Sequence, residues 1–329
     1  MISNSLFSSM RLPVIGAPMF IISNPALVIA QCKAGIIGSF PALNARPQAL
    51  LDEWLHQITE ELAVWDRDNP DRPSAPFAVN QIVHRSNDRL GADMDMCAKW
   101  KVPLIITSLG SREDVNVAVK GWGGTTLHDV VDDRFARKAV ESGVDGLIAV
   151  ATGAGGHAGR LSPFALIQEI RQWFDGPLAL SGAMATGKGI LAAQAMGADF
   201  AYIGSAFIAT PEANAVQSYK HAVIEGRAQD IVYSRYFTGL HGNYLKSSIM
   251  AAGLDPENLP VGDQTTMNFG GDSAAKAWKD IWGAGQGIGA ISNIVPVSQV
   301  IARWQAEYTK GLSLLNAKAG AILDRASLS

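Results

Sequence analysis

The sequence contains little cysteine. Cys32 and Cys97 are the only two among 329 residues, and each lies in a segment with the pattern of a helix. Neither has a second cysteine close by in the sequence, which argues against a disulfide framework and against a thiolate metal site. We therefore expect both to be small buried side chains in a reducing compartment.

Long apolar runs and a strong charge of either sign are also missing. No apolar run approaches the ~20 residues of a membrane span, and Met1–Arg11 lacks the apolar core of a signal peptide. The formal net charge is -3 without a basic cluster, which argues against nucleic acid or an anionic membrane as partner. The composition predicts a soluble cytoplasmic protein that acts on a small molecule.

Several catalytic motifs are absent as well. The six histidines are scattered without the spacing of a zinc site. The chain has no Gly-x-Ser-x-Gly elbow of a serine hydrolase, and no Gly-x-Gly-x-x-Gly fingerprint opens its first strand–helix unit. These absences exclude the commonest hydrolase and dinucleotide-binding patterns.

Short apolar runs alternate regularly with amphipathic helical stretches. Runs that are apolar on both faces and alternate with helices predict a parallel sheet covered on both sides. Eight such units, in a chain longer than the ~250 residues of a typical barrel, predict an α/β fold of the (β/α)₈ TIM-barrel type. A doubly wound open sheet is the competing architecture. The eight runs are Leu12–Gly16, Ile36–Phe40, Phe77–Asn80, Pro103–Thr107, Thr125–Val130, Gly146–Ala151, Pro177–Ser181 and Phe200–Gly204.

The alternation stops after Thr210, where residues 211–284 show helices without strands. We expect a barrel made of residues 1–210 plus 285–329, and a smaller helical subdomain at 211–284 that acts as a lid or contacts substrate. A long amphipathic helix over Ile294–Lys318 should pack back on the barrel. The helices expected in the subdomain include Ala213–Glu225, Asn243–Ala252 and Ser273–Trp282.

Trp278, Ile281 and Trp282 form an apolar group at the end of this segment. They either make a patch that pairs two copies as a homodimer or belong to the core. The sequence leaves both arrangements open.

A glycine-rich loop after the sixth run carries the candidate catalytic residue. Active sites of such barrels lie at the carboxyl ends of the strands, and in Thr152–Gly159 four glycines surround His157. Glycine allows positive φ and close approach of backbone N–H groups to a ligand, while imidazole exchanges a proton near neutral pH. We predict that His157 is an acid–base residue; a flexible loop with an incidental histidine is the alternative.

Two further loops predict a phosphate site. Ser181-Gly182-Ala183 ends the seventh run, and Tyr202-Ile203-Gly204-Ser205 ends the eighth and leads into a short apolar helix. Phosphate sites of these barrels are commonly built from the loops after strands seven and eight and the amino terminus of a short extra helix. Two ordinary strand–helix turns are the alternative.

Four more positions are candidates for ligand contact. Ala17-Pro18-Met19 follows the first run and lets the backbone approach a flat ligand, and Asn80 ends the third run with an amide that suits a heterocycle edge. His128 lies near the end of the fifth run, where a histidine satisfied within the structure is the competing interpretation. Gln286 lies in a glycine-rich turn that either closes over a ligand or is a hinge.

Together these segments resemble the nitronate monooxygenase family, formerly called 2-nitropropane dioxygenases. The resemblance covers nearly the whole chain, and the segment Ala154–Gly159 is its most specific part. The other matching pieces are Ala17-Pro18-Met19, Phe77–Asn80, Ser181-Gly182-Ala183, Gly197-Ala198-Asp199, Tyr202-Ile203-Gly204-Ser205 and Gly285-Gln286.

The resemblance implies an FMN cofactor across the mouth of the barrel, with a nitroalkane or nitronate and O₂ as substrates. It implies that His157 is the active-site base, which deprotonates a neutral nitroalkane or orients the nitronate, and it leaves His128 as a candidate substrate contact. The implied cofactor-binding residues are Ala17, Pro18, Met19, Asn80, Gly155, Gly156, Ser181, Gly182, Ala183, Tyr202, Ile203, Gly204, Ser205 and Gln286.

Two departures from the family pattern keep other functions open. Val150–Gly153 replaces Gln-Gly-x-Glu, which removes an amide that contacts flavin or substrate, and Gly182-Ala183 replaces Gly-Gly. The first alternative is an FMN-dependent NAD(P)H reductase of the enoyl-ACP or quinone reductase type on the same scaffold. A flavin-free barrel enzyme for a phosphorylated substrate and a non-catalytic flavin-binding protein are the others.

Overall fold

Eight parallel strands form the centre of the molecule. The computed structural model describes residues 7–260 and 280–326, and side chains as far as residue 322. Each of the eight apolar runs contains one strand, so the predicted strands are confirmed. The strands are β1 (Val14–Gly16), β2 (Gly38–Pro41), β3 (Phe77–Ile82), β4 (Leu104–Ser108), β5 (Thr125–Val130), β6 (Gly146–Val150), β8 (Leu178–Ser181) and β9 (Phe200–Ile203).

The sheet closes on itself. Its strand order is β1-β9-β8-β6-β5-β4-β3-β2, and every neighbouring pair is parallel. The two end strands are joined because the Gly16 N–H donates to the Ile37 carbonyl at 2.8 Å and the Ile37 N–H donates to the Val14 carbonyl at 3.1 Å. The predicted TIM barrel is confirmed, and the doubly wound open sheet is excluded.

The barrel interior is a packed apolar core. Its cluster includes Ile15, Leu104, Leu127 and Ile148 from different strands, all at most 1% exposed. The ring of Phe7 lies 4.7 Å from that of Phe200, at the amino-terminal end of β9. The amino-terminal end of the barrel is therefore filled by apolar side chains.

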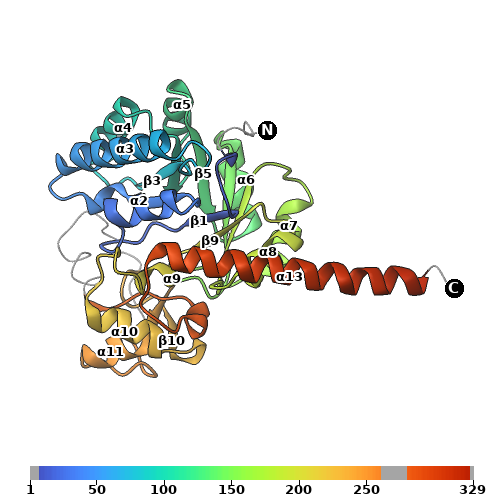
Figure 1. Ribbon diagram of the computed structural model, residues 1–329. Helices are drawn as coiled ribbons and strands as arrows, with labels where there is room; N and C mark the ends of the chain where they lie inside the picture. Colours follow the sequence, from blue (N-terminus) through green and yellow to red (C-terminus); the bar gives the residue numbers. More distant parts are fainter. Residues whose placement is uncertain (1–6, 261–279, 327–329) are drawn as a thin grey trace.

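Helices follow the strands and cover the outside of the barrel (Figure 1). Their starts are capped by side chains: Asn24, Asp132 and Thr186 each accept a hydrogen bond from the N–H three residues on. Gly143 follows the helix capped by Asp132, and Gly197 follows the helix capped by Thr186. Their φ values of 84° and 109° are expected for helix-to-strand joints. The helices are α2 (Pro25–Lys33), α3 (Leu50–Asp68), α4 (Leu90–Lys99), α5 (Glu113–Gly121), α6 (Asp133–Glu141), α7 (Pro163–Arg171), α8 (Gly187–Ala195) and α9 (Ser205–Ile208).

The segment after the barrel is not purely helical, and this part of the prediction is wrong. It contains α10 (Gln217–Glu225) and α11 (Lys246–Ala251), but also β10 (Ile231–Ser234) and β11 (Gly242–Leu245). These two strands pair with β7 (Gly156–His157) in a three-stranded antiparallel sheet. Four-residue strands carry too little periodicity to be separated from a helix, and β11 depends on pairing with Gly156 and His157, which are distant in sequence. The expected helix over 273–282 lies mostly outside the described residues.

The two described residues of the apolar group at the end of this segment belong to the core. Ile281 is 6% exposed, and Trp282 stacks on Tyr219 with ring centroids 5.0 Å apart and planes 9° apart. Trp278 lies outside the described residues. The core interpretation therefore holds for Ile281 and Trp282.

A long last helix, α13 (Val297–Ala326), packs along α8, as the amphipathic pattern predicted (Figure 1). Trp304 anchors it: the ring is fully buried, its Nε1–H donates to the Ala185 carbonyl at 2.9 Å, and it meets Phe207 edge to face. From Leu312 on, the helix projects beyond the rest of the molecule and its side chains are mostly exposed.

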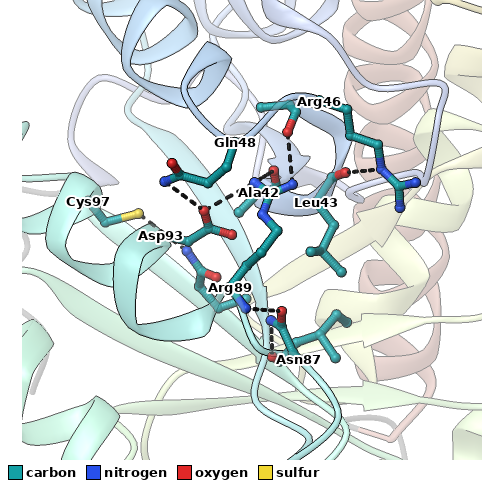
Figure 2. A network of polar contacts seen from close by, with 11 residues as sticks. Ala42, Leu43, Arg46, Gln48, Asn87, Arg89, Asp93 and Cys97 are labelled. Atoms are coloured by element: carbon teal, nitrogen blue, oxygen red, sulfur yellow. Dashed lines mark hydrogen bonds and ion pairs between the residues drawn. The ribbon is translucent and has the colours of Figure 1, made fainter. Parts of the chain in front are cut away.

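A buried ion pair holds the loop after β2 against α4 (Figure 2). The Arg89 guanidinium donates to the Ala45 carbonyl at 2.9 Å and to Asp93 Oδ1 at 3.1 Å, and Gln48 donates to the same carboxylate. Asp93 is fully buried, and this burial raises the pKa of its carboxyl against the opposing effect of Arg89. The contacts fix the loop that carries Leu43 toward the mouth of the barrel.

Cys32 and Cys97 are both free and buried, as predicted, and burial raises the pKa of each thiol to about 12. Among the described helices, none is both long and apolar enough to cross a membrane.

Candidate active site

A cavity of about 800 Å³ lies at the carboxyl ends of the barrel strands. The barrel supplies most of its wall, and the segment after the barrel supplies Tyr219, Tyr233, Leu240 and His241 on the other side. This volume is within the range of about 300–1,000 Å³ that is usual for small-molecule and cofactor sites. The cavity therefore has the place and the size of an active site.

Most of the predicted site residues meet in this cavity. The loop after β6 contributes its glycines and histidine, and the loops after β1 and β9 contribute small residues. The predicted residues that line the cavity are Ala17, Pro18, Met19, Asn80, His128, Gly155, Gly156, His157, Ser181, Tyr202, Gly204 and Ser205.

His157 is held on the cavity wall by the small antiparallel sheet. It pairs with Gly242 on β11, and its Nε2 lies 3.0 Å from the Thr238 hydroxyl, which donates its own proton to the Leu240 carbonyl. The Thr238 oxygen therefore accepts from Nε2–H, which assigns the lone pair of the neutral ring to Nδ1. Desolvation lowers the pKa of His157 to about 4, so the imidazole is neutral at physiological pH.

The glycine loop that carries His157 packs closely on residues 283–286. A Cβ built on Gly155 would lie 2.7 Å from the Gly285 nitrogen, and one built on Gly285 would lie 2.6 Å from the Gly153 carbonyl oxygen. The Asn243 amide donates to the Ala154 carbonyl at 2.6 Å. The glycines at 155 and 285 are thus required by contact between backbones within the protein itself.

Asp129 is a cavity residue that sequence reasoning missed. It lies on β5 next to His128, and its Oδ2 accepts a hydrogen bond from the Ser108 hydroxyl at 2.5 Å. Desolvation raises the pKa of this carboxyl to about 6. A carboxylate one residue from the carboxyl end of an apolar strand was the signal that could have identified it, because barrel catalytic groups occupy that position.

Asn80 belongs to the same polar group. Its amide nitrogen donates to the Ile106 carbonyl at 3.1 Å and to the Ser108 hydroxyl oxygen at 2.8 Å. Both N–H bonds are therefore used inside the protein, and its Oδ1 is the atom left for a ligand.

His128 is satisfied within the structure and also lines the cavity. It is 5% exposed, and its Nδ1 lies 2.7 Å from the Thr107 hydroxyl. Burial lowers the pKa of this imidazole to about 4.

Four predicted residues do not line the large cavity. Ile203 is 2% exposed and packs outward against the helices, while Gly182 forms the turn after β8 with φ of 140°. Ala183 and Gln286 line a separate hollow of about 560 Å³. The Gly153 carbonyl accepts the N–H of both, at 3.3 and 2.9 Å, so these two residues brace the glycine loop.

Aromatic side chains stand at the mouth of the cavity. Tyr233 stacks on His241 with ring centroids 5.0 Å apart, and the Arg160 guanidinium lies 2.7 Å from His241 Nε2 and 5.9 Å from the Tyr233 ring. The pKa of His241 is lowered, by desolvation first and then by Arg160 and Arg235.

A closed parallel barrel with such a cavity at the carboxyl ends of its strands has the architecture of TIM-barrel enzymes. The family model for nitronate monooxygenase matches residues 4–307, and the chain belongs to the nitronate monooxygenase family. The protein is an oxidoreductase, and the predicted family is confirmed.

Comparison with individual proteins agrees with this assignment. The chain is 25% identical to a nitronate monooxygenase of Paraburkholderia phytofirmans over 359 aligned residues, which cover 92% of this chain and 94% of that one. Its fold is similar to that of a nitroalkane oxidase from Streptomyces ansochromogenes, with a TM-score of 0.78, 22% identity, and 94% and 99% of the two chains covered. FabK from Thermotoga maritima matches with a TM-score of 0.75, 21% identity, and 96% and 98% covered.

Proposed function

We propose that this protein is an FMN-dependent enzyme that oxidises alkyl nitronates with O₂. The observation that carries the proposal is the place of His157, a neutral imidazole on the wall of a cavity to which the loops after β1, β6 and β9 contribute small residues. Small side chains there leave room for a flat cofactor and a small substrate, and the imidazole supplies a proton acceptor beside them.

The loop after β9 fits a cofactor that approaches the backbone. Gly204 has φ of -110°, which any residue adopts, and a Cβ there would meet only Ala17 and Met19 side-chain atoms at 3.4 and 3.5 Å. The fold itself therefore does not require glycine at this position. A ligand that approaches the backbone of the loop closely would require glycine there. Gly204 with Ser205 would hold the phosphate of FMN.

Asn80 and the glycine loop would hold the rest of the cofactor. The Asn80 Oδ1 is the acceptor left for a ring N–H of the flavin, and Gly156 presents its backbone to the same cavity. Because the N–H groups of Ala183 and Gln286 donate to Gly153, we assign the phosphate to the loop after β9 and give those two residues a bracing role.

His157 would be the active-site base. Its Nε2–H donates to Thr238, so Nδ1 carries the lone pair that would accept the α-proton of a neutral nitroalkane, and burial keeps the ring neutral. Bound FMN supplies the electron acceptor for the nitronate and the site where O₂ reacts. Residues 211–284 would act as the lid, because Tyr219, Tyr233 and His241 form the outer wall of the cavity.

An anaerobic absorbance titration of the purified protein tests this function. We expect a flavin spectrum that loses its main visible band when ethyl nitronate is added and changes little with NADPH. Loss of the band with NADPH alone would instead support an FMN-dependent NAD(P)H reductase. A colourless protein that binds no added FMN would contradict the proposed function, although the barrel fold would stand.

Variants at two glycines test the cofactor site separately. Gly204→Val should fold but lose FMN, because the added methyl groups enter the space assigned to the phosphate. Gly91→Val is the control, since a Cβ on Gly91 would meet nothing within 4 Å. Retention of FMN by Gly204→Val at wild-type affinity contradicts the assignment.

A further inference from the structure

Asp129 is a carboxylate in the cavity to which the proposed function gives no role. It lies near the carboxyl end of β5 and lines the same cavity as His157. In the described part of the chain, no lysine, arginine or histidine nitrogen lies within ion-pair distance of its oxygens. A half-buried carboxylate without a cation costs free energy of folding, so its presence here requires a reason.

A row of hydrogen bonds connects Asp129 to Asn80 across three neighbouring strands. Asn80 lies on β3, Ser108 ends β4, and Asp129 lies on β5. The Asn80 Nδ2 atom lies 2.8 Å from Ser108 Oγ, which in turn lies 2.5 Å from Asp129 Oδ2. All three residues line the cavity. The row is therefore a continuous polar strip at the carboxyl ends of these strands.

The direction of each hydrogen bond in this row follows from its ends. The Ile106 carbonyl, which can only accept, lies 3.1 Å from Asn80 Nδ2, so the amide nitrogen must be on that side. The second hydrogen of Nδ2 then donates to Ser108 Oγ, and the Ser108 hydrogen is left for Asp129 Oδ2. The carboxylate thus keeps the Ser108 oxygen ready to accept, and the Asn80 amide is held with Oδ1 as its remaining atom for a ligand.

The turn after β4 also holds the carboxylate. The Leu109 N–H donates to Asp129, and Leu109 has φ of 64°, a left-handed conformation that costs free energy for a leucine. Strain of this kind persists where the surrounding structure requires it. Desolvation raises the pKa of Asp129 to about 6, against the hydrogen bonds from Ser108 and Leu109, so the group is ionised at pH 7.5. The cavity therefore contains a negative charge in a fixed position.

We propose that Asp129 is a positioning residue for the flavin: through Ser108 it holds the Asn80 amide toward the ring, and its negative charge makes the bound cofactor harder to reduce. The inference rests on the proposed function, which assigns the flavin ring to Asn80. Reduced FMN carries more negative charge than oxidised FMN, so a fixed carboxylate in the same cavity disfavours the reduced form.

The hydrogen-bonded row acts in the same direction as the charge. An amide whose N–H groups donate toward an anion is polarised, which makes its oxygen a stronger acceptor. A stronger acceptor at a ring N–H leaves the ring richer in electrons and therefore harder to reduce. A ring that is harder to reduce also gives up its electrons more readily, which suits turnover with O₂.

The midpoint potential of the FMN-loaded protein, measured under nitrogen at pH 7.5 against a reference dye, tests the effect of the charge. Asp129→Asn removes the charge and retains an oxygen that accepts from Ser108. We expect this variant to raise the ratio of the dissociation constants of oxidised and reduced FMN by ~10-fold. For a two-electron couple, this ratio corresponds to a shift of ~30 mV to more positive potential.

Asp145→Asn is the matched control for the lost charge. Asp145 precedes β6 at the opposite end of the barrel, and an Asn oxygen there can still accept from the Thr126 N–H. This variant should keep the wild-type potential. An unchanged potential in Asp129→Asn, or the same shift in both variants, overturns the proposal.

Ser108→Ala tests the connection to Asn80, because it keeps the carboxylate of Asp129 and removes the hydroxyl between the two. We expect oxidised FMN to bind ~3–10-fold more weakly, the scale of one hydrogen bond that no longer holds the amide in place. Fluorescence titration of the flavin-free protein measures this affinity. Ser111→Ala is the control, since it removes a hydroxyl from the same cavity that has no hydrogen-bond partner among the described residues. Wild-type affinity in Ser108→Ala overturns the connection.

Neither measurement uses a nitronate, so the two proposals fail separately. A protein that oxidises ethyl nitronate but keeps its potential in Asp129→Asn overturns the role of Asp129 and leaves the proposed function in place. A shifted potential in a protein that oxidises no nitronate supports the role of Asp129 and contradicts the proposed function.

Discussion

At the scale of single residues, the cavity contains two ionisable groups whose charges are set by the same cause in opposite directions. Desolvation lowers the pKa of His157 to about 4 and raises that of Asp129 to about 6, because burial disfavours whichever form is charged. At neutral pH His157 is thus a neutral imidazole and Asp129 is a carboxylate. Pairs of groups with pKa values moved in this way are typical of acid–base sites.

Replacement of His157 tests its role as the active-site base. His157→Ala should keep FMN bound, because the phosphate and ring contacts lie elsewhere, and should lower turnover of neutral nitroethane by ~10²–10⁴-fold. Steady-state oxygen consumption and the flavin spectrum measure the two effects. Thr238→Val, which removes the acceptor of Nε2–H and the bond to the Leu240 carbonyl, should give a smaller loss; full activity in His157→Ala would exclude the role.

Asp129 should also make stability depend on pH. Its folded pKa of about 6 exceeds the ordinary value of 3.8, so the folded protein binds the extra proton between these values and loses stability as pH rises through that window. The shift of about 2 pH units corresponds to about 2–3 kcal/mol. Urea unfolding of Asp129→Asn should therefore show a gain of that size at pH 7.5 and little gain at pH 4; a gain independent of pH would contradict the shifted carboxyl.

At the scale of elements, the loops that shape the cavity are held by contacts outside it. The loop after β2 is tied to α4 through Arg89 and Asp93 (Figure 2), and the His157 loop is tied to β11 through backbone pairing and Asn243. Each loop supplies lining residues and is held by neighbouring elements. The site is thus organised by the elements around it.

The buried pair of Arg89 and Asp93 allows a direct test of this support. Arg89→Leu leaves the Asp93 carboxylate buried without its cation, which should lower the free energy of unfolding by about 3–5 kcal/mol. The double variant Arg89→Leu with Asp93→Asn removes the uncompensated charge and should recover most of the loss. Chemical denaturation measures the free energy of unfolding of both variants. Equal losses in the single and double variants would show that lost packing, not the uncompensated charge, causes the destabilisation.

At the scale of the whole molecule, the barrel and the segment after it form one enclosure. The strand-end loops supply the cavity floor and the residues around Tyr219, Tyr233 and His241 supply its outer wall. The helix α13 packs on the barrel near Trp304, whose Nε1–H donates to the Ala185 carbonyl, and then leaves the body of the protein (Figure 1). Its two halves therefore differ in what they contribute to stability.

Removal of residues 313–329 should be nearly neutral. The described side chains from Leu312 to Ile322 are largely exposed, and exposed substitutions usually change stability by less than about 0.5 kcal/mol. The truncated protein should keep its unfolding temperature and its FMN content, as measured by calorimetry and absorbance. Trp304→Ala is the contrast, with an expected loss of about 3–5 kcal/mol because it empties a fully buried site.

The repeating pattern of the sequence determined the barrel, its eight strands and most of the strand-end residues. Runs such as Gly146–Ala151 are apolar because both faces of a parallel strand are buried, so such a run shows its strand without knowledge of the partner. The position of His157 after the sixth run followed from the same pattern. Strand ends of a parallel barrel meet at one face, whatever the details of packing.

Only the tertiary structure decided the rest. The strand β11 pairs with the His157 loop and β10 pairs with β11, and strands this short have too little local periodicity to be predicted from the sequence. The Gly153 carbonyl accepts hydrogen bonds from the N–H groups of Ala183 and Gln286. These N–H groups are therefore used within the protein, which the residue types do not reveal. Burial raises the pKa of Asp129 against the opposing effect of a hydrogen bond from Ser108 on the neighbouring strand. Pairing, competition for hydrogen bonds and desolvation all depend on groups distant in the chain, and the folded structure alone brings these together.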